Sequence, residues 1–285
     1  MRIFIPAFCV LLLGCCFART QATTPTKWDN VERARTILKD GLDSNDYSIR
    51  IEAITATSMI GHNEVLLSRL EQFLHDKNID VRLATVNTLG DLHTARREQI
   101  LRTVVADEKT PEVSFAAAKI LAASDDPAGI QALMAAYDGS RKTRSNALKR
   151  RERSFFEKFH SAPSAVLFIV GEGIGSVPVP GAGEGFTAIS QLLKDPGLSD
   201  RASVVLILAR KRGPESLDLL RNALQDKDWS VRAAAAQMIA HTARLDLHDA
   251  LPPLFDDKNQ KVRFRAAGAY LHLLLVERKA EKKQE

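Results

Sequence analysis

Apolar residues recur along most of the chain at intervals of three and four, which is the spacing of one face of an α-helix. One such stretch holds Val65, Leu66, Leu70, Phe73 and Leu74. A polar turn follows it, and a second helical stretch runs from Val81 to about Gly90. No window alternates apolar and polar positions for more than a few residues, so the pattern predicts an all-α chain.

Proline marks the start of several predicted helices. Thr110-Pro111, Asp126-Pro127 and Gly213-Pro214 each place a capping residue before a proline. Proline fits the first helical position because the N–H that it lacks would have no partner there. We therefore expect helices to begin at these three sites.

A turn motif between two helices recurs along the chain. The sequence LHDKNIDVRLA at residues 74–84 returns as LQDKDWSVRAA at 224–234 and as FDDKNQKVRFRA at 255–266. Weaker copies lie at residues 42–53, 106–116, 137–147 and 193–202. Internal repeats of this length are typical of helical repeat proteins.

The arginine of the motif sets the repeat length. It falls at positions 50, 82, 144, 201, 232 and 263, and serine replaces it at position 114. The spacing is near 31 residues except between 144 and 201, where it is 57. The sequence therefore predicts seven two-helix units with an insertion of about 26 residues between the fourth and the fifth.

The motif resembles that of the HEAT repeat family, particularly the short HEAT-like form also found in phycobilisome lyases. The resemblance covers roughly residues 30–276 apart from the insertion. It implies a ladder of hydrogen bonds between neighbouring units, made by Asp76, Arg82, Asp226, Arg232, Asp257 and Arg263. Unit three has Ser114 in the arginine column, and unit five has Asp200 where a core valine belongs. We expect those two joints to be weaker or irregular.

The predicted fold is a right-handed α-solenoid of about seven HEAT-like repeats. Stacked repeats form an extended curved surface, which suits a macromolecular ligand. The expected organisation is a signal peptide at 1–18, a polar linker at 19–27, repeats one to four at 28–160, a glycine-rich apolar insert at 161–185, repeats five to seven at 186–276, and a charged tail at 277–285.

The first residues have the pattern of a secretory leader. Arg2 precedes an apolar stretch at residues 3–13, and small residues follow. Leu12-Leu13-Gly14-Cys15 resembles a bacterial lipobox, in which Cys15 would be acylated. Cleavage after Ala18 is the alternative. Either choice predicts an exported protein, periplasmic or membrane-anchored, and the three cysteines all lie within the first sixteen residues, so no disulfide framework is expected.

Residues 141–160 hold most of the excess positive charge. Eight basic residues against two acidic ones give this segment +6, whereas the whole chain carries +5. Leu148, Phe155 and Phe159 fall on one helical face. The segment is either a solvated outer face over a buried stripe or a contact for phosphate, anionic lipid or an acidic protein.

The insert combines an apolar run at residues 165–170 with six glycines at residues 171–185. Ser176 stands where the dinucleotide-binding pattern GxGxxG requires its last glycine, and the Gly-Lys-Ser/Thr of a P-loop does not occur. Neither phosphate-binding pattern is therefore present. The glycines permit either close packing on the solenoid or a contact loop. The residues proposed to touch a partner lie in the basic segment and in the insert; they are Lys142, Lys149, Arg150, Arg153, Phe168 and Ile169.

No sequence pattern for catalysis emerges. The seven histidines form no HExxH or HxxxH pair, and no GxSxG occurs. We therefore expect no catalytic, cofactor or metal residues, and interpret the chain as a non-enzymatic scaffold that binds a protein partner, possibly acidic, with nucleic acid disfavoured. The alternative implied by the resemblance is a HEAT-like enzyme related to bilin lyases or DNA glycosylases.

Overall fold

A computed structural model describes residues 26–61, 63–92, 94–137, 189, 192–193, 195–210 and 213–283. Every regular element within these residues is a helix, so the all-α prediction is confirmed. No helix in this part of the chain is both long enough and apolar enough to cross a bilayer.

The helices come in pairs that correspond to the predicted units. The N-terminal half contains α1 (Lys27–Leu42), α2 (Tyr47–Thr57), α3 (Glu64–Phe73), α4 (Ile79–Asp91), α5 (Ala95–Asp107), α6 (Pro111–Ala122) and α7 (Pro127–Tyr137). The C-terminal half contains α11 (Asp200–Leu208), α12 (Pro214–Ala223), α13 (Trp229–His241), the 3-10 helices η1 (Leu245–Ala250) and η2 (Pro252–Asp256), and α14 (Gln260–Glu281). In the last unit the two 3-10 helices stand where the other units have a first α-helix. Helices α6, α7 and α12 begin at Pro111, Pro127 and Pro214, as the sequence predicts.

The recurring turn also caps the second helix of units one, two, six and seven. In these units one side chain at the same place in the motif accepts a hydrogen bond from the N–H two residues later; the four residues are Asp46, Asn78, Asp228 and Asn259. Such a cap satisfies one of the N–H groups that have no partner inside the helix. The polar part of the motif therefore sets where the second helix starts in these four units.

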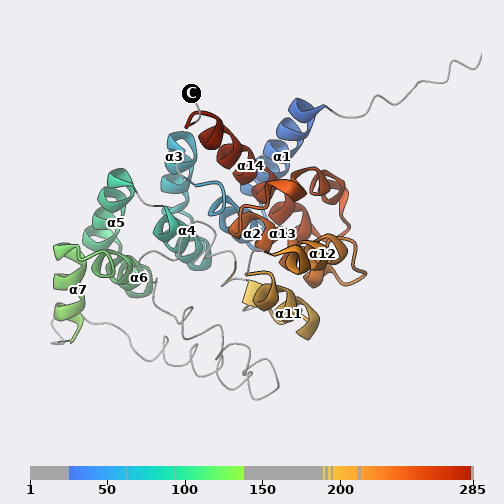
Figure 1. Ribbon diagram of the computed structural model, residues 1–285. Helices are drawn as coiled ribbons and strands as arrows, with labels where there is room; N and C mark the ends of the chain where they lie inside the picture. The colour runs from blue at the N-terminus through green and yellow to red at the C-terminus, as the bar shows by residue number, and fades with distance from the viewer. Residues whose placement is uncertain are drawn as a thin grey trace, which may run out of the picture.

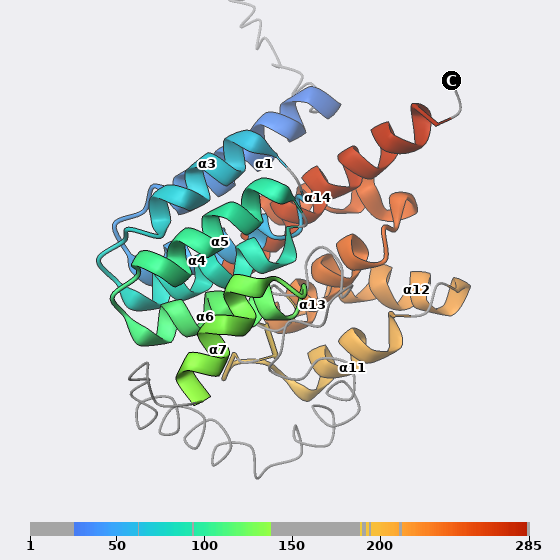
Figure 2. The same ribbon diagram turned by 90° about the vertical axis from the view of Figure 1, so that its left-hand side faces the viewer.

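The units are not stacked in sequence order. Helix α14 of unit seven packs against α1 and α2 of unit one, and the red and blue ends of the chain lie side by side in both views (Figures 1 and 2). The spatial order is therefore five, six, seven, one, two, three, four. Helices α7 and α11 lie at the two ends of this arc (Figure 1).

Two glycines allow α14 to approach unit one closely. A Cβ on Gly41 of α1 would lie 2.5 Å from the Phe264 ring of α14. A Cβ on Gly268 of α14 would lie 2.6 Å from Met59 Cε and 2.7 Å from the carbonyl oxygen of Ala56. Because both gaps are too small for a methyl group, glycine at these positions lets the two halves of the chain meet.

The second helices form the centre of the molecule. Helix α13 is buried along nearly its whole length, including the four alanines at 233–236. A helix without a polar face is typical of an interior position. Helix α14 continues to Glu281, beyond residue 276 where the last repeat was expected to end, and Glu277 forms an ion pair with Lys27 of α1 there.

Candidate functional site

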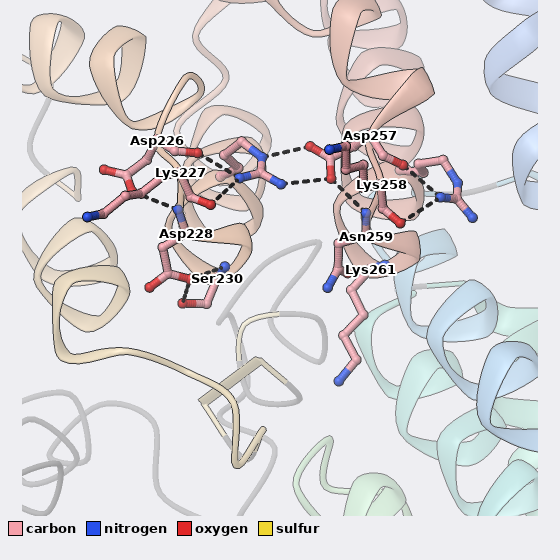
Figure 3. A network of polar contacts seen from close by, with 10 residues as sticks. Asp226, Lys227, Asp228, Ser230, Asp257, Lys258, Asn259 and Lys261 are labelled. Atoms are coloured by element: carbon pink, nitrogen blue, oxygen red, sulfur yellow. Dashed lines mark hydrogen bonds and ion pairs between the residues drawn. The ribbon is translucent and has the colours of Figure 1, made fainter.

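An arginine of unit six links three segments of the chain. Arg232 on α13 donates from Nε and Nη2 to the two carboxylate oxygens of Asp257, at 2.7 and 2.8 Å (Figure 3). Its Nη1 donates to the carbonyl oxygens of Asp226 and Lys227, at 2.6 and 3.1 Å. One side chain therefore closes its own turn and binds the turn of the next unit.

Arg50 repeats this arrangement, and Arg201 repeats the ion pair to the next unit. Arg50 donates to the carbonyl of Ser44 in its own turn at 2.8 Å and pairs with Asp76 of unit two at 3.1 Å. Arg201 of unit five binds both carboxylate oxygens of Asp226 in unit six. The structure thus brings the recurring aspartates and arginines of the motif together. Each of these aspartates pairs with the arginine of the preceding unit, and not with the arginine of its own unit.

The joints beside unit three depart from this pattern. Arg82 pairs with Glu108 at 3.4 Å and donates to Thr110 Oγ1 at 2.6 Å. Ser114 bonds only inside its unit, to the carbonyl of Val105. Arg102 of α5 takes over the joint to unit four, because its Nε donates to Asp126 at 2.8 Å.

The joint between units seven and one is built from other residues. Arg263 donates to the carbonyls of Asp257 and Lys258, but the next turn offers Ser44 where the other units have an acid. Arg265 of α14 instead pairs with Glu52 of α2 at 3.0 Å. Its side chain is 2% exposed, so this ion pair lies inside the protein.

The ladder favours the charged form of Asp226 and Asp257. Burial raises the pKa of Asp257, but hydrogen bonds from Arg232 and the Asn259 N–H outweigh it and leave that pKa below its usual value. The Arg201 guanidinium, followed by the Asp228 N–H, lowers the pKa of Asp226. The Asp257 partner in turn raises the pKa of Arg232. These charge-assisted bonds connect neighbouring repeats.

The outer ends of the array expose apolar side chains. Ile130, Met134 and Tyr137 are 44%, 56% and 85% exposed, and their spacing places them on one face of α7. At the other end, Val204 and Leu208 are exposed on α11. Such apolar surface on a folded protein often marks an interaction site.

Several residues singled out in the sequence lie outside the described residues. These are the lipidation candidate and the proposed contact residues, namely Cys15, Lys142, Lys149, Arg150, Arg153, Phe168 and Ile169. Within the described ranges, no group of three or more His, Cys, Asp or Glu side chains could hold a metal ion.

Sequence reasoning missed Arg102, Arg265 and Glu52. A signal existed for Arg102, because Asp126 follows it by 24 residues and the other ladder pairs are 25 or 26 residues apart. No comparable signal existed for the pair between Arg265 and Glu52, which are 213 residues apart.

Paired helices, a recurring turn and ion pairs from each unit to the next define an α-helical repeat protein. A sequence profile described as HEAT repeats matches residues 66–149 and 187–270, more than half of the chain. The chain therefore belongs to the HEAT repeat family, whose arrays serve as scaffolds for protein interaction. A comparison with curated proteins finds no match.

Proposed function

We propose that this chain is an exported, non-catalytic scaffold that binds an acidic protein at the unit-four end of the array. The observation that carries the proposal is the stripe of exposed apolar residues on α7, Ile130, Met134 and Tyr137. Among the described helices α7 packs on α5 and α6, so its exposed stripe lies at one end of the arc that these helices form.

The sequence next to α7 supports an acidic partner. Residues 141–160 follow this helix directly and carry a net charge of +6. Positive charge beside an apolar contact steers an acidic partner toward it and makes association sensitive to salt. Lys142, Lys149, Arg150 and Arg153 would supply the charge, with Phe168 and Ile169 adding apolar contact.

The test is quantitative capture from an envelope extract with the full chain as bait. Met134→Glu combined with Tyr137→Glu should abolish capture of the specific partner, and high salt should weaken it. Val65→Glu is the matched control, because Val65 is 80% exposed on α3, away from this end. Equal loss in both variants, or unchanged capture by the α7 variant, would remove the proposed site.

Export and lipidation have their own test, motivated by Leu12-Leu13-Gly14-Cys15. Intact-mass analysis should find a processed chain whose first residue is a lipid-modified Cys15, and Cys15→Ala should remove the lipid. A processed chain that begins at Arg19 without lipid would leave a secreted scaffold. An unprocessed chain would contradict export.

A further inference from the structure

An exposed tryptophan lies where the chain enters the fold. Trp28 is in the first turn of α1, and its side chain is 69% exposed. The guanidinium of Arg278, near the end of α14, lies over its ring at 5.9 Å from the ring centre. Helix α1 therefore begins beside the end of α14, and both of these ends point to the same side of the molecule in Figures 1 and 2.

The end of α14 separates its charges by sign. Arg278 and Lys279 in the last turn of α14, and Lys282 and Lys283 directly after the helix, are exposed, and continuing the helical spacing through the C-cap would place all four within a sector of roughly 140° around the helix axis. Glu277 and Glu281 fall outside this sector, and Glu277 is paired with Lys27. Cations near a helix C-terminus also complement the helix dipole. The helix dipole alone would not explain why these cations are separated from the glutamates or why they lie beside a tryptophan.

We propose that Trp28 with the basic face of residues 278, 279, 282 and 283 is a contact surface for an anionic lipid bilayer. Tryptophan favours the headgroup region, and clustered Lys and Arg bind anionic headgroups. Cys15, the proposed lipidation site, precedes Trp28 by thirteen residues in the sequence. The need for a second contact rests on that proposed lipidation: one acyl chain gives only marginal attachment, so a basic surface on the folded chain would supply the second contact that stable binding requires.

This surface is separate from the proposed protein contact. Helix α7 lies far from the end of α14 in both views, so the two surfaces do not compete. An acidic protein is the other class of partner that four cations could bind. The tryptophan beside the cations favours the bilayer, because tryptophan and clustered cations both suit the headgroup region.

The experiment measures the fluorescence of Trp28. The chain has two tryptophans, so Trp229→Phe leaves Trp28 as the only one. The full chain is mixed with vesicles of brominated phosphatidylcholine, with or without phosphatidylglycerol. Bromine quenches tryptophan on contact, so quenching is expected with phosphatidylglycerol and should fall at high salt. Failure of Trp28 to be quenched in vesicle-bound protein would overturn the proposal, whatever the outcome of the partner capture.

A charge-reversed variant tests the basic face. Combining Arg278→Glu, Lys279→Glu, Lys282→Glu and Lys283→Glu should lower the affinity for anionic vesicles, measured by quenching of Trp28, at least about 10-fold, since each cation near an anionic surface contributes on the order of 1 kcal/mol. The control combines Lys77→Glu, Lys109→Glu, Lys227→Glu and Lys258→Glu at exposed turn positions, which changes the net charge equally and should have little effect. Far-UV circular dichroism verifies that both variants fold.

Two results would contradict the basic face as a lipid contact. Equal loss in the two variants would mean that only net charge matters. Unchanged quenching together with lost capture of an acidic protein would assign the face to a protein partner.

Discussion

Arg232 and Asp257 lie 25 residues apart in the sequence and form a two-point ion pair between units six and seven. The side chains are 15% and 6% exposed. The planar guanidinium matches the carboxylate, and its remaining amino group is bound to the carbonyls of its own turn. The pair therefore fixes the second helix of one unit against the turn of the next.

Replacing Arg232 by alanine should destabilise the protein by about 1–3 kcal/mol, because Asp257 and two carbonyls lose a charged donor in a partly buried place. Arg232→Lys should recover only part of the loss, since an ammonium group cannot reproduce the two-point geometry. Urea unfolding measures both changes. The control is Arg221→Ala, whose pair with Asp218 is exposed, and it should cost less than about 0.5 kcal/mol. Equal losses at the two positions would refute a structural role for the ladder.

The spatial order of the units predicts a cross-link between the two ends of the described chain. Lys27 Nζ and Glu277 Oε2 are 2.5 Å apart although 250 residues separate them. A carbodiimide, which joins amines to carboxylates without a spacer, should therefore link Lys27 to Glu277, and peptide mass spectrometry would identify the product. Lys39 and Asp43, 3.1 Å apart within α1, report that the reagent has reacted.

Isotope mixing excludes links between two copies. Equal amounts of labelled and unlabelled chain should give no mixed Lys27–Glu277 product. Mixed product, or no product while the pair of Lys39 and Asp43 reacts, would contradict the order of units found here.

The repeat architecture could be predicted because its signals are local. Each helix cap joins a side chain to the N–H only two residues later, and the capping residue recurs at the same place in the motif. These residues are Asp46, Asn78, Asp228 and Asn259. The arginine column could be read for the same reason, since Arg82, Arg232 and Arg263 each bond a carbonyl six residues earlier. Local bonds leave a record in the sequence at fixed intervals.

The order of the units could not be predicted, because it depends on contacts between distant segments. Nothing in the sequence marks Gly41 and Gly268 as points of close approach. Only the fold shows that Phe264 and Met59 fill the space beside them. The partner of Arg265 likewise lies on another unit, 213 residues away. A repeat period defines the units and says nothing about which two outer faces meet.

Acidification should destabilise the joint between units seven and one. His248 of η1 stacks on Tyr270 of α14 at 4.0 Å between ring centres, and Tyr270 donates to the Lys27 carbonyl. Burial lowers the pKa of His248, outweighing the neighbouring Asp249 carboxylate; Lys27 and Glu277 exert smaller, opposing effects. Burial, and then Arg210 and His272, lower the pKa of His241.

The sign follows from proton uptake. Below about pH 6.5 the unfolded chain binds protons that the folded histidines do not. Stability should therefore fall as the pH drops from about 6.5 toward the lower pKa values of the folded state, by up to about 1.4 kcal/mol per pH unit for each histidine. Urea unfolding at a series of pH values measures the slope. His248→Phe keeps a ring against Tyr270 and should reduce it, and an unchanged slope would show that His248 does not contribute.

Close packing at Gly268 gives the most direct mutational test of the joint between the two halves of the chain. Alanine raises helix propensity by about 1 kcal/mol over glycine, so at an open helical site the substitution would stabilise. At Gly268 the added methyl would lie 2.7 Å from the carbonyl oxygen of Ala56, and this backbone atom must move. We expect Gly268→Ala to cost about 1–3 kcal/mol, as overpacking in a core does.

Gly213→Ala is the matched control, because nothing lies within 4 Å of a Cβ at that position and its backbone is extended at φ −158°. This variant should cost less than about 1 kcal/mol, because alanine is a poorer N-cap than glycine but restricts the unfolded chain more, and the two effects oppose each other. A second observation separates local strain from loss of the joint. If Gly268→Ala pushes α14 away from α2, the carbodiimide link between Lys27 and Glu277 should weaken together with stability. A stabilised Gly268→Ala variant with the link intact would mean that α14 does not pack on unit one as closely as the structure places it.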